Sequence, residues 1–406
     1  MAKPQIRIKG FDGEWCKNRL VDTVLLYNGL TYAPSDIREK GTLVLRSSNV
    51  QQDEITLTDN VYVNPSVVNS PFVQKGDIIV VVRNGSRELI GKHAQIKTSL
   101  TNCVIGAFMA GIRGENPEFV NALLSTKSFK DEVTKNLGAT INQITNGTFR
   151  KMEFFFPQQD EQKAIGTYFR SLDALIQAAA KKIDSLKQMK AACLQSMFPQ
   201  PGETAPKVRF KGFTGDWETK MLNECLDIST EKNLDNNFGI NDVLSVSDDF
   251  GVINQIQLLG RSYAGKSVSN YGILKNGEIV YTKSPLSSKP YGIVKYNPGD
   301  TGIVSVLYAI YRAKEGVSAE FIHYYFDPAW RLNAYLRPLV NKGAKNTMNI
   351  SDEMALNGTI IIPNSLQEQE QIASFFHEMD NQIRLHEQRL GKLKQIKASC
   401  LDKMFV

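Results

Sequence analysis

The stretch of sequence that decides the fold occurs twice in this chain. Residues 161–198 read EQKAIGTYFRSLDALIQAAAKKIDSLKQMKAACLQSMF, and residues 368–405 read EQEQIASFFHEMDNQIRLHEQRLGKLKQIKASCLDKMF. Each residue of the second copy lies 207 positions after its counterpart without a gap, so that Phe169 corresponds to Phe376 and Cys193 to Cys400. A match of this length within one chain indicates an internal duplication.

The apolar residues of each copy follow the pattern of a long helix. From Ile165 to Met197 they alternate at intervals of four and three positions, which is the heptad spacing of helices that pack along their length. At 1.5 Å per residue, a helix of this length spans roughly 55 Å. We expect an antiparallel coiled-coil pair that forms a rigid spacer; the alternative is that each helix packs on its own domain. Lys190 and His386 on the seam are expected to set its register.

A second pair of matching segments opens each half of the chain. Residues 4–15 read PQIRIKGFDGEW and residues 206–217 read PKVRFKGFTGDW. Between the matching ends, residues 20–150 and 222–355 share little beyond their patterning. A frame that repeats while its filling differs predicts a pseudo-dimer, in which the frame has one mechanical role and each filling recognises something different.

The predicted fold class is α+β: two similar domains separated by the two long antiparallel helices, with a pseudo-two-fold internal repeat. Short apolar runs predict strands, and helices are expected inside each domain at Glu118–Leu137 and Ala319–Leu336. The expected strands include Thr42–Arg46, Ile78–Val82, Val104–Met109, Ile279–Tyr281 and Gly302–Tyr311. The expected division is a first domain at 1–156, a helix at 157–198, a linker at 199–206, a second domain at 207–362 and a helix at 363–406.

Composition narrows the class of protein without naming a partner. The 406 residues carry a formal net charge of +6, which permits an anionic partner such as nucleic acid. The 5 cysteines include no C-x-x-C pair, so we expect neither a disulfide framework nor a zinc knuckle. No signal peptide or membrane-length apolar run stands out, and a cytoplasmic location is expected.

Several loops carry residues suited to DNA. Arginine pairs with guanine and asparagine with adenine, whereas serine, threonine and lysine mostly contact phosphates. The loops 138–145 and 343–350 hold equivalent places before the two long helices, where phosphate contact and a structural turn are both open. The candidates for DNA contact are Arg46, Ser47, Asn49, Arg83, Asn84, Arg87 and Lys92 in the first domain, and Lys266, Tyr281, Lys283, Ser284, Lys289, Tyr291 and Lys345 in the second.

Motifs for catalysis are incomplete. Residues 260–267, GRSYAGKS, match the phosphate-binding loop of nucleotide-binding proteins, but no convincing helix follows and no strand ends in a magnesium-binding aspartate. Glu218 and Lys220 resemble the end of a nuclease motif without its upstream part. The chain has 4 histidines and no adenine-methyltransferase Asn-Pro-Pro-Tyr motif. We therefore expect a non-catalytic chain that binds no metal or cofactor; a nucleotide-dependent enzyme using Lys266 is the rival interpretation.

The duplicated frame resembles the specificity subunit of type I restriction–modification enzymes. The matching features are R-[IF]-K-G-F-x-G-[ED]-W at 7–15 and 209–217, the E-Q near each helix start and the closing L-K-Q-x-K-x-x-C-L-x-x-M-F. Residues 45–51 and 80–92 look like a first target-recognition domain of this family, and residues 271–284 look like a second.

The resemblance implies that each domain reads one half of a split, asymmetric double-stranded DNA target and that the helices fix the gap. It also implies docking of methyltransferase subunits, usually two, which use S-adenosylmethionine, and of restriction subunits that use ATP and magnesium. We expect Phe169, Phe198, Phe376 and Phe405 to contact partner subunits. Alternatives are a specificity subunit of another restriction class, with a fused methyltransferase–nuclease partner, and an assembly scaffold that does not bind DNA.

Overall fold

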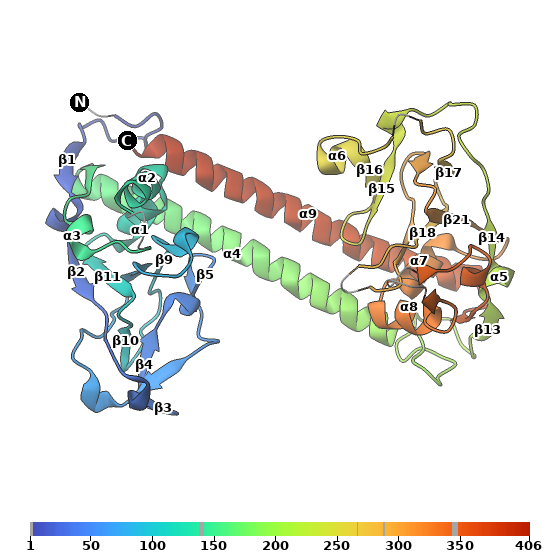
Figure 1. Cartoon of the computed structure of the whole chain (residues 1–406), viewed down its shortest axis with the longest axis horizontal. Helices are drawn as coiled ribbons and strands as arrows, with labels where there is room; N and C mark the ends of the chain where they lie inside the picture. The colour runs from blue at the N-terminus through green and yellow to red at the C-terminus, as the bar shows by residue number, and fades with distance from the viewer. Residues whose placement is uncertain (1–2, 138–141, 266, 287–288, 343–347) are drawn as a thin grey trace. The chain divides into compact units, whose positions relative to one another are not determined.

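The computed structural model describes residues 3–137, 142–265, 267–286, 289–342 and 348–406. It divides into two compact units, which we call unit 1 (Met1–Lys181 with Glu387–Val406) and unit 2 (Lys182–His386). The two long helices each belong to both units. Helix α4 (Gln159–Ser196) begins in unit 1 and ends in unit 2, whereas α9 (Leu366–Met404) begins in unit 2 and ends in unit 1 (Figure 1).

Unit 1 is a mixed α and β structure with two four-stranded sheets. Its strands are β1 (Cys16–Arg19), β2 (Val24–Asn28), β3 (Ile37–Arg38), β4 (Thr42–Leu45), β5 (Val50–Gln51), β6 (Glu54–Ile55), β7 (Val61–Val63), β8 (Ile78–Val81), β9 (His93–Gln95), β10 (Cys103–Ile105), β11 (Met109–Gly114) and β12 (Glu153–Phe156). Its shorter helices are α1 (Pro117–Ser125), α2 (Lys127–Asn136) and α3 (Asn146–Phe149). The antiparallel sheet has the order β2-β11-β8-β9, and the other sheet, β10-β4-β7-β3, includes the parallel pair β10–β4.

Unit 2 contains a sheet of the same design. Its strands are β13 (Glu218–Met221), β14 (Leu226–Ile228), β15 (Leu244–Ser247), β16 (Gly251–Asn254), β17 (Gly272–Leu274), β18 (Ile279–Thr282), β19 (Ile293–Tyr296), β20 (Gly302–Val304), β21 (Tyr308–Ala313), β22 (Asn341–Lys342), β23 (Met348–Asn349) and β24 (Thr359–Ile362). Its shorter helices are α5 (Leu222–Cys225), α6 (Gln255–Leu259), α7 (Ala319–Phe326) and α8 (Ala329–Leu336). The order β14-β21-β18-β19 reproduces β2-β11-β8-β9, and the pair β13–β24 reproduces β1–β12. The predicted α+β class with an internal repeat is confirmed.

The central strands of the two sheets are buried along their whole length. All four residues of β8 and all four of β18 are buried. Strands covered on both faces are apolar continuously rather than alternately, which is why Ile78–Val81 and Ile279–Thr282 stand out in the sequence. These strands form the rigid support from which the loops discussed below extend.

The matching opening motifs tie each domain to the start of a long helix. The guanidinium of Arg7 donates two hydrogen bonds, of 2.8 and 2.7 Å, to the carboxylate of Glu161 on α4. Arg209 does the same to Glu368 on α9, at 2.6 and 2.8 Å. Both glutamates are buried, so each bidentate pair satisfies a charge that would otherwise be costly to bury.

In unit 1 the end of α9 completes the core. The ring of Phe405 lies 6.1 Å from Trp15 in an edge-to-face contact, 5.5 Å from Phe119 and 5.9 Å from Phe169 on α4. Met404 belongs to the same cluster. The helix that begins in unit 2 therefore supplies part of the hydrophobic core of unit 1.

In unit 2 the end of α4 has the reciprocal place. Phe198 lies 6.1 Å from Trp217, edge to face, 5.3 Å from Phe321 and 5.9 Å from Phe376 on α9. Met197 belongs to this cluster as well. The repeat thus extends from the sequence to individual ring contacts.

The prediction that four phenylalanines contact partner subunits is wrong. Phe169, Phe198, Phe376 and Phe405 are exposed by only 2%, 0%, 0% and 7%. Their rings fill the two cores, and a partner could reach them only if a core opened. The spacing of apolar residues along a helix does not show which neighbours cover each ring, so the sequence alone does not separate core from interface here.

Within each unit the two long helices run antiparallel and contact each other. In unit 1, Asp173 of α4 pairs with Lys397 of α9 at 2.7 Å, while Tyr168, earlier on α4, bonds to Cys400, later on α9. In unit 2 the counterpart of the first pair joins Lys190 to Asp380 at 2.8 Å. Seam residues such as Ile183 are buried, as the heptad spacing predicts.

Two predicted helices are each divided. The helix expected at Glu118–Leu137 breaks at Thr126, whose backbone is extended and whose hydroxyl caps α2 by accepting from Phe129 N–H at 3.3 Å. The helix expected at Ala319–Leu336 breaks at Pro328, which caps α8. Both breaks follow from residues that favour helix starts over helix interiors.

Two predicted strands also end early. The strand expected at Val104–Met109 is interrupted after Ile105, and the one expected at Gly302–Tyr311 after Val304. In each case the chain turns and then enters the neighbouring sheet as β11 or β21. Continuous apolar patterning does not reveal such a change of sheet, because the residues on both sides of the turn are apolar.

Candidate nucleic-acid interface

Equivalent loops join β8 to β9 in unit 1 and β18 to β19 in unit 2. Val80 pairs with His93, and Tyr281 pairs with Val294, so the two loops have the same length. Both reach their last strand through a glycine of positive φ, +84° at Gly91 and +89° at Gly292. At Gly292 a Cβ would lie 1.8 Å from the carbonyl oxygen of Thr282, so only glycine fits.

The support under both loops is also repeated. Asp77 precedes β8 and accepts two hydrogen bonds of 2.7 Å from Arg113 on β11. Glu278 precedes β18 and accepts from Arg312 on β21, at 3.2 and 2.9 Å. The hydrogen bond to Asp77 raises the pKa of Arg113. These pairs fix the starts of the central strands and are structural.

The β8–β9 loop of unit 1 carries three of the predicted residues: two are exposed, and the third joins this loop to another. Arg83 is exposed, and its guanidinium lies 5.0 Å from the ring centre of Phe108. Asn84 donates a 3.1 Å hydrogen bond to the hydroxyl of Ser47, which joins the loop after β4 to the loop after β8. Arg87 is exposed on a short turn.

Of the remaining predicted residues in unit 1, two are partly exposed and one is buried. Lys92 is half-buried. Arg46 pairs with Asp59 at 2.8 Å and keeps about a third of its side chain exposed (35%). Asn49 is fully buried: it donates to the carbonyl oxygens of Thr56 and Asp59 and accepts from the amide of Arg46. The prediction that Asn49 contacts a base is wrong, because all its polar atoms hold the loop together.

Two predictions in unit 2 are wrong. Tyr281 is 2% exposed and donates to the carbonyl of Tyr291 at 2.7 Å, and burial raises the pKa of its hydroxyl. Lys289 is 7% exposed, and its ammonium is 2.7 Å from Asp248 and 3.0 Å from the carbonyl of Asp327. Neither group can reach a DNA molecule at the surface. Sequence order alone did not show that these side chains point inward.

The other predictions in unit 2 remain near the surface or lie outside the described residues. Ser284 is exposed, Tyr291 is half-buried, and Lys283 pairs with Asp352. Lys266 and Lys345 lie outside the described residues, as do 138–141 and 343–347 of the two loops before the long helices. What Lys266 and Lys345 do stays a prediction.

The sequence did not single out two apolar side chains at these edges. Phe108 stands directly before β11 and Leu307 directly before β21, and they are 54% and 64% exposed. Phe108 was assigned to a strand interior because its neighbours are apolar. The signal that could have found both is the alignment of the two halves, which places each at the turn where the chain changes sheet.

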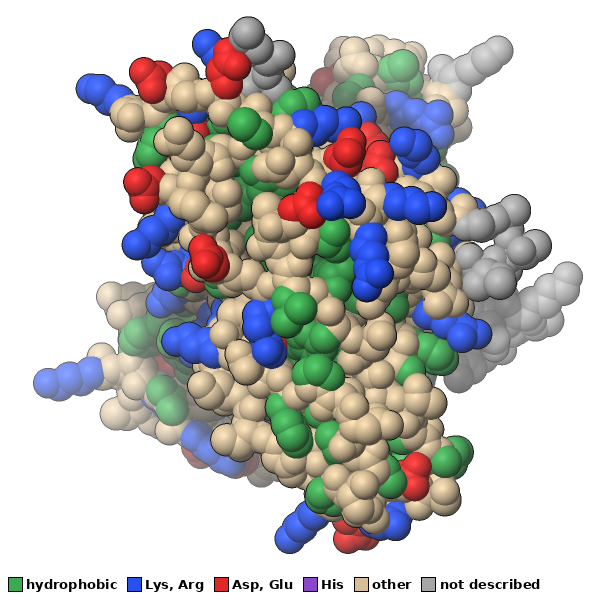
Figure 2. Space-filling view, turned by 90° about the vertical axis from the view of Figure 1, so that its left-hand side faces the viewer, with side chains coloured by type: hydrophobic (Ala, Val, Ile, Leu, Met, Phe, Trp, Pro, Cys, Tyr) green, Lys and Arg blue, Asp and Glu red, His purple; other side chains and the backbone are tan. Residues whose placement is uncertain are grey.

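Charged side chains do not form a single basic stripe on the visible face of unit 1. Figure 2 shows Lys and Arg spread over this face, with Asp and Glu among them and hydrophobic side chains between. Such a surface does not attract a polyanion as strongly as a continuous basic patch would.

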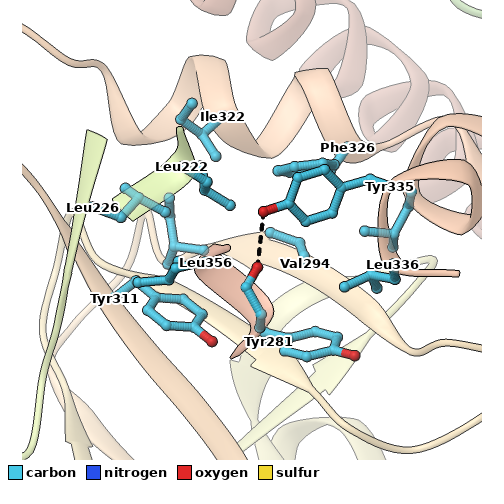
Figure 3. Close-up of a pocket in the computed structure, with 13 residues that line it drawn as sticks. Leu222, Leu226, Tyr281, Val294, Tyr311, Ile322, Phe326, Tyr335, Leu336 and Leu356 are labelled. Atoms are coloured by element: carbon cyan, nitrogen blue, oxygen red, sulfur yellow. Dashed lines mark hydrogen bonds between the residues drawn. The ribbon is translucent and has the colours of Figure 1, made fainter. Parts of the chain in front are cut away.

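A small cavity lies in the core of unit 2, lined by apolar side chains and by Tyr281, Tyr311 and Tyr335 (Figure 3). Tyr335 donates to the carbonyl of Ala355 at 2.9 Å, so its hydroxyl is already satisfied. The cavity volume is about 20 Å³, room for about one water molecule. It is far too small for a nucleotide or for S-adenosylmethionine.

The GRSYAGKS segment does not have the setting of a phosphate-binding loop. Helix α6 ends at Leu259, just before the segment, and among the described residues the next regular element is strand β17, the reverse of the strand–loop–helix order. Across the part of the chain that the structure describes, no group of three His, Cys, Asp or Glu side chains is placed to hold a metal ion. In that same part, no helix combines the length and apolarity that crossing a membrane demands.

Comparison with known proteins places the chain in a family. The family described as type I restriction modification DNA specificity domain matches twice, at residues 13–188 and 215–395, which together are most of the chain. Among curated proteins, the specificity subunit of the type I restriction enzyme StySPI from Salmonella potsdam is 23% identical over 184 residues, 43% of this chain and 40% of that protein. That of EcoKI from Escherichia coli K12 is 24% identical over 173 residues, 40% of this chain and 37% of that protein.

The matches to these curated relatives span less than half of their length. A solved structure, the S subunit of a type I restriction–modification system from M. genitalium, matches 100% of this chain and 99% of its own, with a TM-score of 0.63 and 14% identity. At this identity the likeness concerns the fold, which has the same overall design. With both halves matched by one family and the fold shared, this chain belongs to the type I restriction–modification DNA specificity family.

Proposed function

We propose that this chain is the DNA-recognition subunit of a type I restriction–modification complex, in which each unit reads one half of a bipartite, asymmetric target. The observation that carries the proposal is the pair of equivalent loops. They leave equivalent edges of equivalent sheets, have the same length and end at equivalent glycines. Yet Arg83 and Asn84 in unit 1 correspond to Ser284 and Pro285 in unit 2. One support with two different surfaces suits two different half-sites.

The exposed groups fit this role chemically. A guanidinium such as that of Arg83 can donate two hydrogen bonds to one guanine, and its contact with Phe108 limits its freedom before DNA binds. Serine hydroxyls at Ser47 and Ser284 suit phosphate oxygens. Phe108 and Leu307 can contact thymine methyl groups or sugars, since both present apolar surface at the same edges.

The long helices complete the proposal. They set the distance between the half-sites and dock methyltransferase subunits, two for a pseudo-symmetric chain. The methyltransferase subunits use S-adenosylmethionine to methylate adenine, and the restriction subunits use ATP and magnesium. The chain itself carries no catalytic step and needs no cofactor; it selects the DNA sequence on which the other subunits act.

Methylation mapping tests the proposal. The chain would be co-expressed with a type I methyltransferase subunit from the same genome, and methylated adenines mapped across the host genome. We expect a split motif that disappears when the chain is omitted. A complex that assembles but adds no methylation would contradict the proposal and favour an assembly scaffold.

The helices can be tested as a ruler by shortening both. Deleting residues 177–183 and the matching 384–390 removes one heptad from each and keeps the seam in register. Because seven residues rise about 10.5 Å, the gap between half-sites should shrink by about three base pairs. The same methylation mapping reads the gap directly, and an unchanged gap would refute the ruler.

A further inference from the structure

Six charged side chains of alternating sign form a continuous row through unit 2. Lys190 and Lys295 each lie between two carboxylates, Lys289 ends the row beside one, and the three ammonium groups match the three carboxylates in charge. The successive N–O distances are 2.8 Å for Asp380–Lys190, 3.0 Å for Lys190–Asp327, 3.2 Å for Asp327–Lys295, 3.2 Å for Lys295–Asp248 and 2.7 Å for Asp248–Lys289. We call these six residues the ion-pair row.

The row begins on the long helices and ends in the candidate recognition loop. Lys190 is on α4 and Asp380 on α9, and Asp327 caps the end of α7. Lys295 is on β19, and Asp248 is in the turn of the hairpin β15–β16. The last member, Lys289, lies in the β18–β19 loop, the loop that presents Ser284.

Three members of the row are well shielded from solvent. The side chains of Lys295, Lys289 and Asp327 are 6%, 9% and 15% exposed. Burial alone would raise the pKa of Asp327, but the charges of Lys295 and Lys190 hold it well below its usual range. Charges at this depth add little net stability, but removing one leaves its neighbours buried and unpaired. The arrangement therefore specifies geometry more than it stabilises.

Unit 1 keeps only the helix end of this row. The pair Asp173–Lys397 corresponds to Asp380–Lys190. The register of β8 with β9, compared with that of β18 and β19, puts Ala94 at the place of Lys295. Ser125, at the end of α1, has the place that Asp327 has at the end of α7. The extension from the helices to the loop is a property of unit 2.

We propose that Asp248, Lys289, Lys295 and Asp327 are positioning residues, which hold the β18–β19 loop at a fixed place relative to α4 and α9. The proposal rests on the proposed function for its consequence: the row keeps the second half-site in register with the helices, while the first is read without it. No member of the row touches DNA in this account. Asp248 acts by fixing Lys289, and through it the exposed part of the loop.

Amide hydrogen exchange of the full chain tests the positioning itself. Asp248→Asn keeps the shape of the side chain and removes its charge, which leaves Lys289 and Lys295 short of a partner. We expect exchange in residues 289–296 to rise about tenfold. The control, Glu231→Gln, breaks the exposed Lys275–Glu231 pair of the same unit, whose side chains are both 44% exposed, and should change nothing. An unchanged rate, or an equal rise throughout unit 2, would overturn the proposal.

Methylation mapping of the assembled complex tests the consequence. Asp248→Asn should raise methylation at sites mismatched in the second half-site about tenfold, with the first half-site read as before. Asp248→Glu, which keeps the carboxylate, should restore discrimination. Equal relaxation of both half-sites, or of neither, would contradict the proposal. If the unmodified chain directs no methylation, the proposed function fails, and the exchange measurement still decides whether the row positions the loop.

Discussion

Unit 1 and unit 2 share a sheet, an opening motif and a core phenylalanine from the far end of a helix, but they tie their hairpins to the helices differently. In unit 1 the hairpin β5–β6 packs beside β9, and Glu54 contacts Lys97 and Gln177 of α4 with a third of its side chain exposed (32%). In unit 2 the hairpin β15–β16 packs beside β19, and Asp248 faces Lys295, which is 6% exposed. The shared parts build the frame, and the parts that differ set how tightly each loop is held.

The largest expected effect comes from the reciprocal phenylalanines. Phe198→Ala should destabilise unit 2, and Phe405→Ala unit 1, each by about 3–5 kcal/mol, because each ring is surrounded by a packed aromatic cluster. Hydrogen exchange resolved by peptide would locate each loss. Met189→Ala on the exposed face of α4 is the control. A loss spread equally over both units would break the comparison.

Next come the two arginines of the opening motifs. Arg7→Ala leaves the buried carboxylate of Glu161 unpaired, and Arg209→Ala leaves that of Glu368, so each should cost about 3 kcal/mol. Denaturant unfolding of the full chain gives the values. Arg19→Ala, which breaks the exposed pair with Asp22, should leave the unfolding midpoint unchanged. Clearly unequal losses for Arg7 and Arg209 would show that the repeat is not energetically symmetric.

Acid should lower the stability of both units, and at lower pH it should lower that of unit 2 more. Burial lowers the pKa of His93 in unit 1 and lowers that of His323 in unit 2 to about 3. Since the unfolded state takes up a proton near pH 6.5 and the folded state does not, this stability is present above pH 6.5 and falls by about 1.4 kcal/mol per pH unit below it for each histidine.

The two units should differ below about pH 4, the ordinary carboxyl range. The lysines of the ion-pair row hold the pKa of Asp248 and of Asp327 below that range, so their stabilisation is present above it and is lost as pH falls through the lowered values. Exchange measured per unit from pH 7 to pH 3 would show unit 2 losing more. A steeper loss in unit 1 would contradict this account.

The smallest expected effect is at the exposed ion pair between Glu54 and Lys97 in unit 1. Glu54→Gln should change the stability of unit 1 by less than about 1 kcal/mol, because the Glu54–Lys97 pair is open to solvent. Amide hydrogen exchange in residues 93–97 of this variant can be compared with exchange in residues 289–296 of Asp248→Asn. If the two substitutions loosen their loops equally, burial of the row in unit 2 has no special role.

The frame could be predicted from the sequence, and the loop side chains only partly. Heptad spacing and the opening motif gave the helices and the repeat because periodicity and spacing are local properties. Tyr281 and Lys289 were assigned to a surface because their residue types suit DNA, whereas the fold turns both inward. The partners of Lys289 lie 41 and 38 positions away, at Asp248 and Asp327, and nothing local announces them.

The same limit applies to the phenylalanines at the helix ends. Phe198 is in the matched segment, and its apolar character was plain, but its neighbours Trp217 and Phe376 come from the other half of the chain. A single sequence shows that such a ring needs cover and does not show what covers it. The exposed position of Phe108 was missed for the opposite reason, since its apolar neighbours resemble a strand interior.

The measurement that tests the central claim most directly is methylation mapping with one unit altered at a time. Arg83→Ala with Arg87→Ala changes exposed groups of unit 1 only. Lys283→Ala with Ser284→Ala changes unit 2 only, at a half-buried lysine paired with Asp352 and at an exposed hydroxyl. The account predicts that the first variant relaxes one half of the motif, the second relaxes the other half, and the gap stays the same. If either variant alters both halves together, the units are not independent readers, and the account is wrong.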